Sequence, residues 1–122
     1  MEINGLQAEL LMAEGKQPWF HILVYSSSSK KVGVNIPPQK VGEFSCDRAY
    51  VHPMGKRGKP LNKSWSTRHF NKLVVKYFDN ENDCLKDYRD TLSKYLEDIE
   101  ESRAYQARLH EERKRDIEAL MI

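Results

Sequence analysis

The sequence gathers positive charge and aromatic rings in one short segment, a combination that suits the binding of phosphate and bases. Six cations fall within seventeen residues, and no Asp or Glu lies between Asp47 and Asp79. Cations displace counterions from a phosphate backbone, and an aromatic ring stacks on a base. The segment therefore predicts binding of nucleic acid or another phosphorylated ligand. The predicted site residues here are Lys56, Arg57, Lys59, Lys63, Trp65, Arg68, His69 and Lys72, with Phe70 interleaved among them.

Patterns typical of catalysis and metal binding are missing from the sequence. None of the four histidines or two cysteines has a partner at metal-ligand spacing, and there is no Gly-x-Ser-x-Gly elbow. The glycines of Gly55–Lys59 lack the spacing of a phosphate-binding loop, and the few carboxylates before residue 79 do not suggest a metal-dependent nuclease. We therefore expect no catalytic residue, no metal, no cofactor and no enzymatic activity.

Charge divides the chain into two blocks. Residues 1–78 hold twelve Lys or Arg against five Asp or Glu, a net charge of +7. Residues 79–122 hold eight against thirteen, a net charge of −5. Two interpretations stay open: the basic block meets an anionic partner, or the two blocks attract each other within a chain or between chains.

The basic block, residues 1–78, predicts an antiparallel sheet of four or five strands, because short β-branched and aromatic runs alternate with turn residues. We expect Pro37-Pro38 to end the third strand, and a bulge or break near Asp47-Arg48 within the fourth. Met54–Thr67 is expected to be a mobile loop in which another strand begins near the end. The expected strands are Gln7–Ala13, Trp19–Ser26, Lys31–Ile36, Glu43–His52 and Phe70–Phe78, the last inside the sheet.

The acidic block, residues 79–122, predicts a long helix or helix pair. Asp79–Asp83 is a strong start signal, and an apolar stripe then predicts that Glu81–Glu100 packs on one face of the sheet. One helix to residue 120 would be about 60 Å long, so it must overhang the sheet or turn back near Ser102. An overhanging apolar stripe favours association with a second copy. The alternative is a solvated, frayed tail.

Residues 58–95 resemble the end of AP2-type or integrase-type DNA-binding domains, which place a helix against a three-stranded sheet. Lys63-Ser64-Trp65-Ser66 is similar to the basic aromatic strand of these domains, and Asn80–Tyr88 to the start of their helix. The chain departs from the family in the strand Phe70–Phe78, the long N-terminal part and the extended tail. The resemblance implies DNA contacts from the sheet face by Arg57, Lys59, Lys63 and Arg68.

The fold class expected is α+β, and the function expected is non-catalytic nucleic-acid binding. The alternative is a small oligomeric, phage-type inhibitor or sequestering protein that binds a nucleotide-like ligand or a host enzyme. Its ligand would lie between subunits, where Arg103 or Arg108 of one tail meets the basic block of another. A third possibility is a pure assembly module. Two cysteines without a Cys-x-x-Cys pair, and no signal peptide or membrane span, predict a cytoplasmic protein, in the host cytoplasm if viral.

Overall fold

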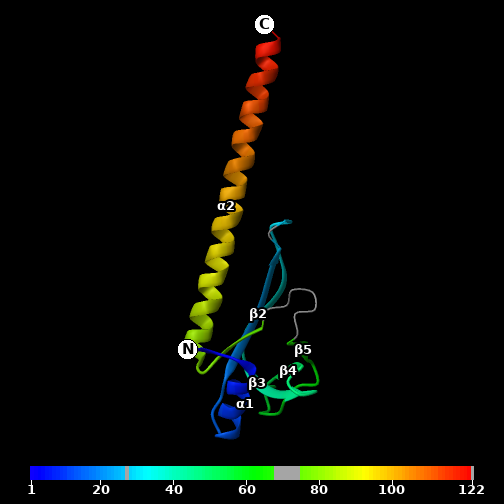
Figure 1. Cartoon of the computed structure of the whole chain (residues 1–122), viewed down its shortest axis with the longest axis vertical. Helices are drawn as coiled ribbons and strands as arrows, with labels where there is room; N and C mark the ends of the chain where they lie inside the picture. The colour runs from blue at the N-terminus through cyan, green and yellow to red at the C-terminus, as the bar shows by residue number, and fades with distance from the viewer. Residues whose placement is uncertain (27, 68–74, 122) are drawn as a thin grey trace. The chain divides into compact units, whose positions relative to one another are not determined.

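The chain has an α+β fold, in which a curled antiparallel sheet is followed by a long C-terminal helix (Figure 1). This computed structural model describes residues 1–26, 28–67 and 75–121. The six strands lie in the order β1-β6-β2-β3-β4-β5. The elements are β1 (Glu2–Ile3), α1 (Gly5–Ala13), β2 (Trp19–Ser26), β3 (Lys31–Ser45), β4 (Tyr50–Pro53), β5 (Trp65–Ser66), β6 (Val75–Phe78) and α2 (Glu81–Leu120).

Two units make up the chain, Met1–Asp90 and Thr91–Ile122. The first, which we call the sheet unit, contains all six strands, α1 and the first ten residues of α2. The second, the helix unit, contains the rest of α2. No helix in the described ranges combines the length and the apolar character needed to cross a membrane.

β3 is the longest strand and joins the two halves of the sheet. Its first part pairs with β2 and its last part with β4. The prediction that Pro37-Pro38 ends this strand is wrong. Phe20 pairs with Gln39 and Ile22 with Ile36, so the two prolines lie in a bulge opposite one residue of β2. A bulge tolerates proline because the missing N–H groups are not needed by the ladder there.

The segment predicted as a first strand, Gln7–Ala13, is instead part of the helix α1. Asn4 caps this helix: its side chain accepts a hydrogen bond from the Gln7 amide (2.8 Å), and the Gln7 side chain accepts one from the Asn4 amide (2.9 Å). This reciprocal capping box starts a helix through residues of high helix propensity. Ala8 then packs in the core with no exposed surface.

Glu43–His52, predicted as one strand with a break, is a hairpin between β3 and β4. Cys46, Asp47 and Arg48 all have positive φ angles, of 52°, 55° and 63°, and Ser45 pairs with Tyr50 across them. Three left-handed residues in succession reverse the chain, so the break was placed correctly but the strand does not continue beyond it.

The core of the sheet unit gathers side chains from elements far apart in sequence. Phe20, Ile22, Val41 and Val51 have no exposed surface, and Tyr77 of β6 packs with them. β6 lies between β1 and β2, as predicted for a strand inside the sheet. Residues 70–74 of that predicted strand lie outside the described residues.

Gly42 marks the point where β3 passes from β2 to β4. The pairing shifts between Val41 and Glu43. A Cβ atom at residue 42 would lie 2.7 Å from the carbonyl oxygen of Pro53, closer than any real contact. Glycine is therefore required for this close approach of two backbones.

α2 is one uninterrupted helix of 40 residues, so the alternative of a turn near Ser102 is wrong (Figure 1). Its start lies within the predicted signal: the Asn80 side chain accepts a hydrogen bond from the Asp83 amide (2.8 Å). Within the sheet unit, Cys84 of this helix is buried. The packing of Glu81–Glu100 on the sheet stays a prediction for the residues after Asp90.

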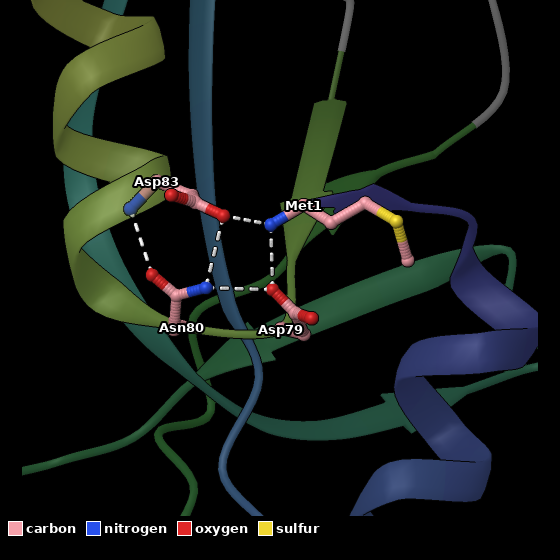
Figure 2. Close-up of polar contacts among 4 residues, drawn as sticks. All are labelled: Met1, Asp79, Asn80 and Asp83. Carbon is pink, nitrogen blue, oxygen red and sulfur yellow. Dashed lines mark hydrogen bonds and ion pairs between the residues drawn. The ribbon is translucent and has the colours of Figure 1, made fainter.

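The N-terminal ammonium of Met1 joins the start of α2 (Figure 2). It donates to Asp79 Oδ1 at 2.7 Å and to Asp83 Oδ2, while the Asn80 amide contacts both carboxylates. The hydrogen bonds to Asp79 and Asp83 raise the pKa of the ammonium. The same bonds lower the pKa of both carboxyls.

Candidate anion-binding site

A cleft of 460 Å³ opens beside the turn that follows β4, and we call it the Trp19 cleft. Its lining combines one indole ring, two lysines, an amide and the backbone of two glycines. Among the described residues that line it, none carries a negative charge. The lining residues are Trp19, Gln39, Lys40, Met54, Gly55, Lys56 and Gly58.

The sheet register brings the indole and one lysine together. Trp19 at the start of β2 pairs directly with Lys40 of β3, so the two side chains lie on one face of the sheet. The Lys40 ammonium lies 5.9 Å from the centre of the Trp19 ring. A cation at this distance from an indole is attracted to the face of the ring. Half-buried Trp19 and exposed Lys40 thus form one wall of the cleft.

The turn that carries Lys56 is ordered by its own backbone hydrogen bonds. The Gly55 amide donates to the Lys59 carbonyl (2.8 Å), and the Gly58 amide donates to the Gly55 carbonyl (3.1 Å). Gly58 has a φ of 74°, which favours glycine. The bridge between Met54 and Pro60 closes the turn. This part of the predicted mobile loop, Met54–Thr67, is therefore a hydrogen-bonded turn.

The base of the turn is fixed to β3 and β4. The Met54 amide donates to the Lys40 carbonyl (3.0 Å), and the Leu61 amide donates to the Pro53 carbonyl (3.0 Å). The His52 ring contacts the Leu61 carbonyl through Nδ1 (2.9 Å). These bonds set the backbone that carries Lys56 beside the strand that carries Lys40.

The predicted site residues are only partly brought together. Lys56 lines the cleft, whereas Arg57 and Lys59 lie on the same turn with exposed side chains. In the described part of the chain, no ion pair of these three residues with a carboxylate is found. Arg68, His69 and Lys72 lie outside the described residues. Arg103 and Arg108 lie on α2 in the helix unit.

Lys63 and Trp65 form a separate pair on the edge strand β5. The Lys63 ammonium lies 4.8 Å from the centre of the Trp65 ring. Trp65 is half-buried, pairs with Val51 of β4 and packs against the core. Its indole nitrogen is buried without a hydrogen-bond partner among the described residues. Most of this ring supports the sheet, and Lys63 covers it.

Trp19, Gln39 and Lys40 were not predicted as site residues. Trp19 was interpreted only as part of a strand, and Lys40 followed the prolines that were expected to end β3. Their pairing depends on the continuation of β3 through the bulge at Pro37-Pro38. The spacing between a tryptophan and a lysine twenty-one residues later carries no signal of this register.

A second polar cluster lies between the sheet and the first turns of α2. His21 is 2% exposed, and its Nε2 atom lies 2.7 Å from Asp87 Oδ2. Burial lowers the pKa of His21, and the hydrogen bond to Asp87 opposes this shift only in part. Lys76 lies 3.5 Å from the same Asp87 oxygen. Phe78 stacks on the imidazole at a ring-centre distance of 5.7 Å.

This cluster joins α2 to the sheet. The rings of Tyr88 and His21 lie edge to face with their centres 5.6 Å apart, and the Tyr88 hydroxyl donates a hydrogen bond to Asn35 Oδ1 (2.6 Å). The burial of His21 shows that its ring is packed inside the sheet unit. Over residues 1–26, 28–67 and 75–121, no group of three or more His, Cys, Asp or Glu side chains is arranged to hold a metal.

No protein-family model, curated protein or solved structure matches the chain. The likeness of residues 58–95 to AP2-type domains stays a prediction from the sequence.

Proposed function

We propose that the chain is a non-catalytic nucleic-acid-binding protein that holds a phosphate and a neighbouring base in the Trp19 cleft. Lys40 and Lys56 bind the phosphate, and the exposed part of the Trp19 ring stacks on the base. The observation that carries the proposal is the cleft itself, where an indole and two ammonium groups meet without a carboxylate among the described lining residues.

The surrounding charge supports an extended anion. Arg57 and Lys59 extend the positive surface beyond Lys56 on the same turn, and residues 1–78 carry a net charge of +7. Such a surface attracts a polyanion and holds it through several phosphates. A single strand suits the cleft best, because its bases are free to stack on the indole.

The binding experiment uses a labelled 12-nucleotide single-stranded DNA, with RNA and duplex DNA of the same length beside it. We expect the double variant Lys40→Ala/Lys56→Ala to weaken binding about tenfold or more and to flatten the dependence of affinity on salt. Trp19→Leu should weaken single-strand binding by about 1–3 kcal/mol. The matched control is Lys31→Ala, which removes an exposed lysine of β3 that does not line the cleft.

The proposal fails if no nucleic acid binds at 50 mM salt, or if Lys31→Ala weakens binding as much as the double variant does. Tryptophan fluorescence of each variant checks that the sheet unit is folded, since Trp65 remains as a reporter in Trp19→Leu.

A nucleotide-like ligand is the second candidate, and the size of the cleft favours it. A volume of 460 Å³ falls within the range of small-ligand sites. A mononucleotide that binds as tightly as the 12-nucleotide strand would favour a sequestering protein over a nucleic-acid-binding one. A host enzyme as the target, the other form of this alternative, would leave both nucleotide and strand unbound.

The proposal includes association of two copies through α2 and a cytoplasmic location. Support for association comes from exposed apolar residues of α2, such as Leu96 and Ile117. Support for the location comes from the two cysteines, Cys46 and Cys84, which are both free thiols.

A further inference from the structure

The helix unit carries one stripe of side chains that has apolar ends and a polar centre. From Leu92 onward, residues at alternating steps of four and three lie on the same face of the helix. The N-terminal end of the stripe consists of Leu92, Leu96 and Ile99, and its C-terminal end consists of Ile117 and Leu120. Leu96, Ile117 and Leu120 are 57%, 60% and 86% exposed.

The centre of the stripe holds polar residues at the same alternating steps. These are Arg103, Gln106, His110 and Arg113. Gln106 lies at the middle, fourteen residues from both Leu92 and Leu120. Towards the N-terminus the stripe passes Arg103 and then three apolar residues, and towards the C-terminus it passes His110 and Arg113 and then two apolar residues. When one copy is reversed about Gln106, the two outermost apolar residues of one end therefore face the two of the other end, whereas Ile99 faces Arg113.

We infer that the face is covered by a second copy of this chain, with the two α2 helices antiparallel and crossing at Gln106. Leu92 then meets Leu120 of the other copy, and Leu96 meets its Ile117. Apolar side chains cover apolar side chains at both ends of the pair. The inference deepens the self-association in the proposed function and does not depend on nucleic-acid binding.

The arginines of the stripe favour the antiparallel arrangement over the parallel one. A parallel pair in register places Arg103 against Arg103 and Arg113 against Arg113, which brings like charges together inside the contact. The antiparallel pair places Arg113 against Ile99, next to the acidic run Glu97–Glu101 of the other copy. That run contains four carboxylates, whereas Arg113–Arg115 contains three cations.

Mass measurement by light scattering tests the association. We expect a particle of twice 14.3 kDa at micromolar concentration. Leu96→Asp places a charge on the stripe and should weaken the dimer at least tenfold. The matched control is Ala104→Asp, which places the same charge on the opposite side of the helix and should leave the dimer unchanged. A monomeric wild-type chain, or equal effects of the two variants, would overturn the inference.

Spin labels test the direction. Cys46 is first replaced by Ser, because it is an exposed free thiol, and a single label is placed at Ala119→Cys or Ala104→Cys. An antiparallel pair separates the two Ala119 labels by about 39 Å along the axis and the two Ala104 labels by about 6 Å. A parallel pair in register gives the same short distance at both positions, because the two helix axes lie about 8–10 Å apart along the whole pair.

A longer distance at Ala119 than at Ala104 therefore supports the antiparallel pair, and equal distances overturn it. Neither label nor the Leu96→Asp variant lies in the Trp19 cleft. Loss of oligonucleotide binding would accordingly leave these measurements unchanged, and loss of association would leave the cleft intact.

Discussion

The sheet unit and the helix unit of this chain are held in shape by different kinds of contact. In the sheet unit, Phe20, Val41 and Val51 are fully buried, and each comes from a different strand. In α2, among the described residues Glu81–Leu120, only Cys84 is buried, and it belongs to the sheet unit. Long-range burial stabilises the sheet unit, whereas the helix unit is a single helix whose backbone hydrogen bonds join residues four apart.

This difference is the reason why we propose a second copy as the partner of the helix unit. An isolated helix gains little stability in water, since most helical stability in proteins comes from packing of an apolar face. The two units can also be observed separately. Trp19 and Trp65 both lie in the sheet unit, so tryptophan fluorescence reports its unfolding, while circular dichroism at 222 nm is dominated by α2.

The largest expected effect comes from a cavity in the core of the sheet unit. Phe20→Ala removes a fully buried ring, which should lower the free energy of unfolding by about 3–5 kcal/mol. Urea titration followed by tryptophan fluorescence measures this change. Ile99→Ala, in the helix unit, should shift the same transition by less than about 0.5 kcal/mol. Equal shifts would show that the two units unfold as one.

A smaller effect concerns the pH dependence of the sheet unit. Burial lowers the pKa of His21 below its ordinary value of 6.5, so below that pH the unfolded chain binds a proton that the folded chain does not. The free energy of unfolding should therefore fall as the pH drops below 6.5. His21→Phe removes the titrating imidazole. The free energy of unfolding of this variant, measured by tryptophan fluorescence, should therefore depend less on pH below 6.5. An unchanged pH profile in His21→Phe would rule out His21 as the source.

The smallest effect comes from the exposed contact between Met1 and the start of α2. Its carboxylates titrate below their ordinary pKa of 3.8, and its ammonium above 8.0. The stabilisation is thus complete between these values, and it is lost as the pH falls through the lowered pKa values or rises through the raised one.

Acetylation of Met1 should remove this contribution and lower the melting temperature slightly at pH 6. Added salt should reduce the difference between the acetylated and free chains, because the groups are exposed. A difference that persists at 1 M salt would contradict this explanation.

The sequence predicted best those features that depend on neighbouring residues. Asp79–Asp83 marks the start of α2 because caps and first-turn carboxylates act within one turn. The misassigned α1 also had a local signal, the pair Asn4 and Gln7, which was overlooked.

Features that depend on distant residues could not be predicted. Trp19 meets Lys40 only because β3 continues through its proline bulge, and the close approach at Gly42 depends on the path of β4. Lys56 was among the predicted site residues, whereas Trp19 and Lys40, which line the same cleft, were not. The register between two strands is fixed by contacts among side chains from the whole core. The pattern of neighbouring residues in the sequence carries no information about those contacts.

The position of Lys40 directly before Val41 ties the cleft to the hydrophobic interior. Lys40 lines the cleft, and its chain neighbour Val41 has no exposed surface. Because the packed interior resists displacement, the cleft wall is preorganised before any ligand arrives. When a ligand of the proposed kind binds, the protein backbone therefore loses little conformational entropy. The loss falls on the lysine side chains.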